Sequence, residues 1–340
     1  MADLRGRVVV VTGASSGIGR AAALGFSRKG ARLVLVSRND DALDNIAKES
    51  VGSGGEALSF SADMADYSAV EEILGFGVSH FGGIDVWVNC AAVLIFGRFE
   101  EVPPPLFRRL VDTNVFGYIN GSQVALKQFR SQGDRGVLIN VSSMLGVAPE
   151  PYVSVYVASK FFIRGLTASI RQELRTTPGI HVCAILPAAI DTPIYQKAAN
   201  VFGRKARSII PVYSAERVAS AVVGAASHPR REIRVGGFAF VLEFGCRVAP
   251  SLVEWIVAVV GPRLQFQEKA EQPHEGNLMA SVSPHEVAGR WRQYWTKLIG
   301  LTSGDYRVRF DSAQPQLPTC SEWVGTQSCW LRMTKLSARR

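Results

Sequence analysis

The fold is decided near the start of the chain, where RVVVV (Arg7–Val11) runs directly into TGASSGIG (Thr12–Gly19). The first stretch is short, apolar and β-branched, which is typical of a buried parallel strand. The second contains three glycines and leads into a helical pattern at Arg20–Lys29. Glycines let the backbone approach a pyrophosphate, and the amino end of the next helix favours negative charge. This order of elements predicts a dinucleotide site, and an ordinary glycine-containing turn is the alternative.

Apolar strand-like runs alternate with helical patterns along most of the chain after this first unit. Further strands are predicted at 31–37, 55–61, 84–89, 136–141, 181–186 and 232–235, and helices at 40–50, 68–81, 104–131, 154–175 and 214–227. Strands alternating with helices of about ten or more residues pair in parallel through right-handed crossovers. The sequence therefore predicts an α/β fold: a Rossmann-type doubly wound parallel sheet, in a single domain with a C-terminal extension. Ligands of such sheets bind beyond the carboxyl ends of the strands.

The stretch NVSSMLGVAPEPYVSVYVASK (140–160) supplies the residue types needed to interconvert a carbonyl and an alcohol. Tyr156 and Lys160 are four positions apart, so they share one face of a helix. An ammonium there favours the phenolate and lowers the tyrosine pKa from about 10, so Tyr156 can exchange a proton with a substrate oxygen. Ser143, on a loop 13 positions earlier, can donate a hydrogen bond to the same oxygen.

Several motifs, in this order, resemble those of the classical short-chain dehydrogenase/reductase family over about Leu4–Gly237. The turn Thr12–Gly19 matches the family's TGxxxGxG, and Asp63 matches the aspartate that meets the adenine ring. Asn89 opens a form of its NNAG motif, and LPAAIDT (186–192) matches its PGxxxT segment beside the nicotinamide. The resemblance implies a nicotinamide-dependent oxidoreductase.

The resemblance also implies which residues form the site. The implied catalytic residues are Asn114, Ser143, Tyr156 and Lys160. The implied cofactor-binding residues are Thr12, Gly13, Ser15, Ser16, Gly17, Ile18, Gly19, Ser37, Arg38, Asp63, Met64, Asn89, Ala91, Tyr156, Lys160, Pro187, Ile190 and Thr192. In the family the lysine also bonds the nicotinamide ribose, and the asparagine holds a water that joins the lysine to solvent. For Asn114, a hydrogen bond to a neighbouring carbonyl inside a helix is the alternative.

Two alanines replace glycines of the family's motifs: Ala92 in the segment Asn89–Ala92, and Ala188 after Pro187. Glycine at such positions usually provides a positive φ or a close approach to the cofactor. A methyl group is accommodated if the backbone stays in an allowed region. We therefore expect a cofactor site that is adjusted rather than lost.

The choice of cofactor depends on the end of the second predicted strand, Ser37-Arg38-Asn39. NAD-binding folds usually place an acidic residue there to hold the ribose 2′-hydroxyl. Arg38 instead offers a guanidinium fork that suits a 2′-phosphate, with Ser37 as a second donor. A solvated surface arginine is the alternative. The sequence predicts NADP(H) in preference to NAD(H).

Composition limits the classes of partner and compartment. The formal net charge is +9, but residues 290–340 carry nine Lys/Arg against three Asp/Glu, so the rest of the chain is nearly balanced and no nucleic-acid-binding face is predicted. The five cysteines are odd in number and form no metal-type spacing, so no metal and a reduced, cytoplasmic setting are expected. Neither a signal peptide nor an uninterrupted apolar stretch of about 18 residues is recognised.

The pattern changes beyond Gly237. We divide the chain into a catalytic Rossmann-fold domain (1–262), a polar and amphipathic extension (263–300) and a weakly ordered basic tail (301–340). A helix with an apolar face is predicted at 251–260. Packing on the core or on a partner subunit is the favoured interpretation, and peripheral contact with a membrane surface is the alternative. The resemblance implies a homodimer or homotetramer.

The sequence thus predicts an NADP(H)-dependent oxidoreductase that acts on the carbonyl or secondary alcohol of a mainly apolar small molecule. Residues expected around the substrate are mostly apolar: Val93, Leu94, Phe96, Met144, Leu145, Tyr152, Ile194 and Tyr195. A sensor or scaffold protein that binds NADP(H) without turnover is the alternative. An epimerase or dehydratase of the extended branch is disfavoured, because that branch generally has the glycine spacing GxxGxxG.

Overall fold

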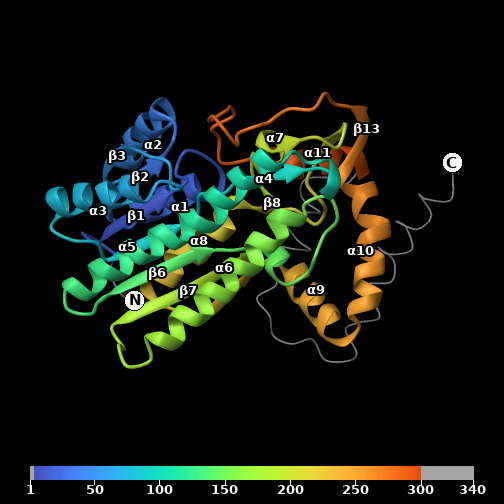
Figure 1. Ribbon diagram of the computed structural model, residues 1–340. Coiled ribbons are helices and arrows are strands. Elements are labelled where there is room, and N and C mark those ends of the chain that lie inside the picture. The colour runs from blue at the N-terminus through green and yellow to red at the C-terminus, as the bar shows by residue number, and fades with distance from the viewer. Residues whose placement is uncertain (1–3, 300–340) are drawn as a thin grey trace. The chain divides into compact units, whose positions relative to one another are not determined.

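A seven-stranded sheet forms the centre of the computed structural model, which describes residues 4–299 (Figure 1). All neighbouring strands of this sheet are parallel. In spatial order they are β3 (Glu56–Ser61), β2 (Arg32–Ser37), β1 (Val8–Thr12), β4 (Val86–Asn89), β6 (Gly136–Val141), β7 (Ile180–Pro187) and β12 (Glu232–Val235). The strand order reverses between β1 and β4, which is where doubly wound sheets bind ligands. The predicted fold class is confirmed.

Helices cover both faces of the sheet (Figure 1). One face carries α1 (Gly17–Ser27), α2 (Asp40–Gly52) and α8 (Ala215–Ser227), and the other carries α3 (Tyr67–Phe81), α5 (Gly117–Ser131) and α6 (Ser154–Glu173). In β1, Val9 and Val11 belong to the apolar cluster that includes α1 and α8, whereas Val8 and Val10 belong to the cluster that includes α3 and α5. Because successive strand residues point to opposite faces, an unbroken run of valines serves both layers.

The helix predicted at 104–131 is interrupted. It consists of α4 (Pro104–Val111), a π-helical turn (Asp112–Phe116) and α5. Within the turn, the side-chain Nδ2 of Asn114 donates to the carbonyl oxygen of Val93, and the backbone N–H of Val93 donates to Asn114 Oδ1, each at 2.9 Å. Single π turns of this kind often occur at functional sites.

The chain after β12 forms two helices, α9 (Gly237–Val248) and α10 (Pro250–Gln265), and then β13 (Phe266–Ala270). β13 pairs antiparallel with β10 (Arg204–Ala206). The predicted helix at 251–260 lies in α10, but it packs on α9 rather than on the sheet and leaves Trp255 64% exposed. The expected packing on the core is therefore wrong for the described residues, while contact with a partner or a membrane surface stays a prediction.

Two absences concern only the described part of the chain. None of its helices is both long and apolar enough to cross a membrane. None of its His, Cys, Asp and Glu side chains gather into a group that could hold a metal ion. The predicted basic tail at 301–340 lies outside the described residues.

Candidate active site

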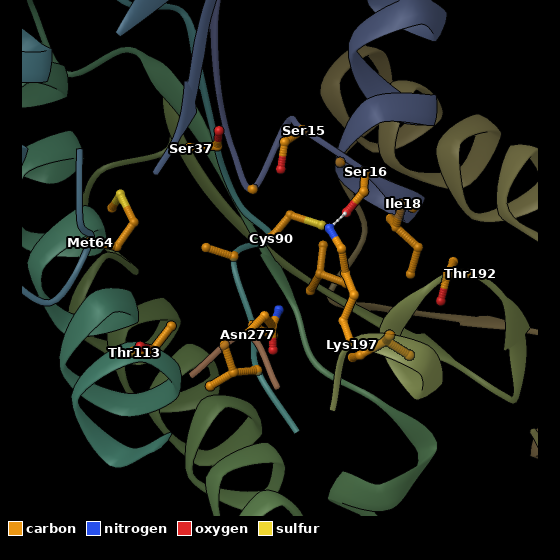
Figure 2. A pocket seen from close by; sticks show the side chains of 18 of the residues that line it. Ser15, Ser16, Ile18, Ser37, Met64, Cys90, Thr113, Thr192, Lys197 and Asn277 are labelled. Carbon is orange, nitrogen blue, oxygen red and sulfur yellow. Dashed lines mark hydrogen bonds between the residues drawn. The ribbon is translucent and has the colours of Figure 1, made fainter. Parts of the chain in front are cut away.

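A pocket opens at the carboxyl ends of the central strands (Figure 2). The residues of the predicted cofactor set that line it are Gly13, Ser15, Ser16, Gly17, Ile18, Gly19, Ser37, Arg38, Asp63, Met64, Ala91, Tyr156, Lys160 and Thr192. Four others of that set, Thr12, Asn89, Pro187 and Ile190, are buried outside this lining. Residues outside the predicted set also line it, among them Thr113, Lys197, Asn277 and Ser281.

The glycine-rich turn between β1 and α1 is shaped so that only glycine fits at key positions. Gly13 has a φ of +69°, and a Cβ there would lie 2.8 Å from the Cα of Ala91. A Cβ on Gly19 would lie 2.2 Å from the carbonyl oxygen of Gly13. The turn therefore presents bare backbone to the pocket at the amino end of α1, which is the geometry that receives a pyrophosphate.

Thr12 and Asn89 support this turn from behind. The Thr12 hydroxyl donates to the carbonyl oxygen of Val88 at 3.2 Å and accepts from the backbone N–H of Cys90 at 3.0 Å. Asn89 Nδ2 donates to Asn140 Oδ1 at 2.8 Å, so its side chain links β4 to β6. Both residues hold neighbouring strand ends in register instead of reaching into the pocket.

Tyr156 and Lys160 lie on one face of α6, as their spacing predicts. Lys160 is only 2% exposed, and its Nζ donates to the carbonyl oxygen of Val141 at 3.2 Å and lies 5.3 Å from the centroid of the Tyr156 ring. Burial lowers the pKa of Lys160 to about 8. Burial also raises the pKa of Tyr156, and the neighbouring Tyr195 and Glu150 raise it further. The expected lowering of the tyrosine pKa is therefore wrong for the protein by itself, because burial favours the neutral phenol.

The other two predicted catalytic residues differ in their surroundings. Ser143 begins the 3₁₀ turn Met144–Gly146, and its hydroxyl accepts from the backbone N–H of Leu145 at 3.1 Å. Ser142 lines the pocket and donates to the carbonyl oxygen of Lys160 at 2.8 Å. Asn114 is fully buried, and its side chain bonds the backbone of Val93, which lies outside its helix. Its expected water relay stays a prediction.

Charged side chains concentrate at the end of the pocket beside β2, where adenosine is predicted to bind. The guanidinium of Arg38 donates to the carbonyl oxygens of Leu278 (2.8 Å) and Asn277 (2.5 Å), so it is not a solvated surface group. Arg109, from α4, also donates to the carbonyl oxygen of Leu278 and forms an ion pair with Asp63. Burial lowers the pKa of Arg38, and the charge of Arg109 lowers it further. No sequence motif indicates Arg109 or Asn277, because only the fold brings α4 and the C-terminal segment (residues 263–299) here.

Comparison with known proteins agrees with this geometry. The family model described as short chain dehydrogenase matches residues 7–201, which is more than half of the chain. The chain belongs to the short-chain dehydrogenase/reductase family. Members are oxidoreductases that act between CH–OH and C=O with a nicotinamide cofactor, so the predicted family and the coarse activity are confirmed.

Relatives in the family include proteins with and without a named substrate. An uncharacterized oxidoreductase of Bacillus subtilis, YxnA, is 34% identical over 305 residues, covering 86% of this chain and 85% of the relative. The 3beta-hydroxysteroid dehydrogenase 1 of Eggerthella lenta is 34% identical over 234 residues, covering 66% of this chain and 88% of the relative. The 3-ketodihydrosphingosine reductase of Bos taurus is 31% identical over 268 residues, covering 76% of this chain and 80% of the relative.

Solved family structures support the fold but cover less of the chain. A short-chain type dehydrogenase/reductase from Mycobacterium marinum superposes with a TM-score of 0.61 at 28% identity, covering 68% of this chain and 95% of that structure. The 86% of this chain that matches YxnA is more than residues 1–262 can supply, so that match must reach into the C-terminal extension.

The two alanines that replace family glycines are accommodated. Neither Ala92 nor Ala188 has a positive φ; among the described residues other than glycine, only Asp134, Tyr152 and Arg290 do. Ala92 lines the pocket, and Ala188 packs in an apolar cluster beside Met144 and Leu186. The backbone therefore stays in an allowed region at both positions, as expected.

Apolar residues pack around Tyr156. Of the residues expected around the substrate, one buried cluster contains Leu94, Phe96, Leu145, Tyr152, Ile194 and Tyr195 together with Tyr156. Phe266 of β13 completes it, in contact with the rings of Phe96, Tyr152 and Phe202. Val93 and Met144 belong to neighbouring clusters.

Proposed function

We propose that this protein is an NADP(H)-dependent oxidoreductase that interconverts the carbonyl and secondary alcohol of a mainly apolar small molecule. The observation that carries the proposal is one pocket lined by both the bare glycine-rich turn and the Tyr156–Lys160 pair. The turn suits a pyrophosphate, and the pair suits proton transfer at an oxygen.

The proposed chemistry assigns the proton to Tyr156. When bound, the nicotinamide supplies or takes up the hydride. Burial keeps the pKa of Tyr156 above its ordinary value, so the phenol is protonated at neutral pH and can donate to an oxygen that gains negative charge. Lys160 lies beside the ring, and its positive charge stabilises the phenolate that forms when the proton leaves.

The charges at the adenosine end support NADP(H). Asp63 is the only carboxylate among the described residues that line the pocket, and it is already paired with Arg109. Arg38 follows the end of β2, where NAD-binding folds usually have an acid, so its guanidinium is placed to face a ribose 2′-phosphate. A 2′-phosphate has to share or replace the bonds from Arg38 to the carbonyl oxygens of Asn277 and Leu278.

The apolar cluster around Tyr156 supports an apolar substrate. Two relatives point the same way, since their names record an alcohol of a steroid and a ketone of a sphingoid base. Both relatives differ from this chain at about two positions in three, so they support the class of substrate rather than its identity.

The experiment is a titration of the protein with NADPH and with NADH, followed by a panel of apolar ketones, aldehydes and secondary alcohols. Nicotinamide fluorescence measures binding and nicotinamide absorbance measures turnover. We expect tighter binding of NADPH and turnover of at least one apolar substrate. Binding without turnover across the panel would favour the sensor or scaffold alternative, and tighter binding of NADH would refute the cofactor assignment.

A further inference from the structure

Lys197 is a buried cation in the cofactor pocket that no family motif accounts for. It ends the short helix α7 (Ile194–Lys197), is only 5% exposed and lines the pocket opposite the glycine-rich turn. Figure 2 shows its side chain reaching across the pocket, where Nζ donates to Ser16 Oγ at 3.3 Å. Its Nζ also lies 3.3 Å from Nδ1 of His285.

The charge of Lys197 is not balanced within the described part of the protein. No carboxylate of those residues lies within ion-pair distance of its Nζ, and its two polar partners are a hydroxyl and an imidazole. Burial lowers the pKa of Lys197 to about 8, and the charge of Arg38 lowers it further. The pKa of His285 is also lowered by burial and by Lys197. Burying an ammonium without an anion is costly, so the arrangement suits an anionic ligand.

The position of Lys197 indicates which part of the ligand it would contact. Ser16 is the residue immediately before α1, so the ammonium points at the amino end of that helix. The partial positive charge there and the bare backbone of the turn favour phosphate oxygens. A phosphate held by the turn would therefore lie between the backbone of α1 and the ammonium of Lys197. It would share or replace the bond from the Gly17 N–H to the carbonyl oxygen of Glu286.

The C-terminal segment holds Lys197 in place. The backbone N–H of Gly17 donates to the carbonyl oxygen of Glu286 at 2.9 Å, next to the His285 that faces Lys197. The backbone N–H of Asn277 donates to the carbonyl oxygen of Lys197 at 2.8 Å. The lysine is thus fixed from both sides by residues that lie after the predicted catalytic domain.

We propose that Lys197 binds the pyrophosphate of the dinucleotide, as a cationic side chain on the side of the pocket opposite the glycine-rich turn. This inference rests on the proposed function for the identity of the ligand. It adds a charged contact to a site where the turn offers only backbone N–H groups and hydroxyls, and it gives the C-terminal segment a part in cofactor binding.

The test compares two fragments that lack the nicotinamide, so it requires no turnover. The fragment 2′-phospho-ADP-ribose carries the pyrophosphate, and adenosine 2′-phosphate does not. For Lys197→Met we expect the affinity for the first to fall by about 10- to 100-fold, as for loss of a hydrogen bond to a charged group, and that for the second by less than about 2-fold. Lys197→Arg keeps the charge and should stay within about 3-fold of wild type for both.

Lys205→Met is the matched control, because Lys205 is an exposed lysine on β10 and its loss should change neither affinity. An equal loss for both fragments would place Lys197 at the adenosine end, and no loss would make it structural; either result overturns the proposal.

If Lys197→Met does not fold, Lys197→Gln is measured instead against the same outcomes. If wild type binds the unphosphorylated cofactor more tightly, ADP-ribose and adenosine replace the two fragments. Absence of turnover in wild type would refute the proposed function without touching this result.

Discussion

At the scale of single residues, burial controls the chemistry of the site more than charge does. Lys160 and Lys197 both line the pocket without a carboxylate partner among the described residues, and burial lowers the pKa of each to about 8. Tyr156 is moved the other way, since burial favours its neutral phenol. A neutral tyrosine beside a partly desolvated lysine is ready to give a proton.

The first prediction concerns this proton. Tyr156→Phe keeps the ring in its apolar cluster and removes the hydroxyl. We expect NADPH to bind as it does to wild type, while kcat falls by about 10²- to 10⁴-fold, the usual contribution of a positioned acid or base. Fluorescence titration and steady-state kinetics measure the two effects. Near-normal turnover in this variant would mean that another group donates the proton.

The second prediction concerns Arg38. Arg38→Asp removes the guanidinium and adds a negative charge at the end of β2, so affinity for NADPH should fall by about 10-fold or more while that for NADH changes little. Arg108→Asp makes the same change at an exposed position on α4 and is the control. A parallel loss of both nucleotides in Arg38→Asp would indicate that Arg38 acts through its bonds to Asn277 and Leu278 instead.

The third prediction concerns Glu150, six residues before Tyr156. Its Oε1 is buried with no hydrogen-bond partner, and burial raises the pKa of its carboxyl from 4.5 to about 7. Because the folded pKa is above the unfolded one, the folded protein holds the proton more tightly, and stability falls as pH rises from about 4.5 to 7. The rise in pKa corresponds to at most about 3 kcal/mol.

Glu150→Gln should therefore be more stable than wild type above pH 7, with a difference that disappears near pH 4. Thermal unfolding measured across this range checks the expectation. Glu100→Gln, at an exposed glutamate, should show no such dependence. A variant less stable than wild type at pH 8 would show that the buried carboxylate has a favourable partner.

At the scale of helices and strands, the elements that can be predicted from the sequence are those that depend on a local sequence pattern. The strands and most helices follow from apolar runs such as VVVVT in β1 and from the alternation of strand-like and helix-like segments along the chain. The interruption of the helix at 104–131 could not be predicted, because a π turn leaves the surrounding helical period almost unchanged. The turn carries a long-range contact, between the side chain of Asn114 and the backbone of Val93, that has no local sequence signal.

The residues of the candidate site likewise divide into those that a sequence motif indicates and those that only the fold brings to the site. Motif residues such as Gly13 and Tyr156 are predicted from their motifs and from the order of those motifs along the chain, and they line one pocket. No local signal indicates Lys197 and Asn277, which line the pocket, or Arg109, which forms an ion pair with Asp63 of the lining. Only the packing of α7, the C-terminal segment and α4 brings these three residues together. A polar stretch that looks like an appendage in sequence therefore provides part of the pocket lining.

At the scale of the whole molecule, that segment joins the two sides of the pocket. The guanidinium of Arg38 bonds the carbonyl oxygens of Asn277 and Leu278, and Glu286 accepts from Gly17. Further on, the backbone N–H of Trp291 donates to Asp191 Oδ1 at 2.8 Å. The segment thus connects β2, the glycine-rich turn and the region beyond β7, which are distant in sequence.

The last prediction separates this segment from the tail. Phe266, Trp291 and Trp295 are each less than 6% exposed, and the two tryptophans form an apolar cluster with Val212. Removing a buried aromatic side chain typically costs about 3–5 kcal/mol, and the total stability of a domain is about 5–15 kcal/mol. A chain that ends at Leu264 should therefore aggregate or melt far below the full chain and bind NADPH weakly.

A chain that ends at Gly300 keeps the whole segment, so its melting temperature and NADPH affinity should match those of the full chain. Thermal unfolding and fluorescence titration of the two truncations decide the matter, and a loss of affinity in the longer one would show that the tail contributes to the cofactor site.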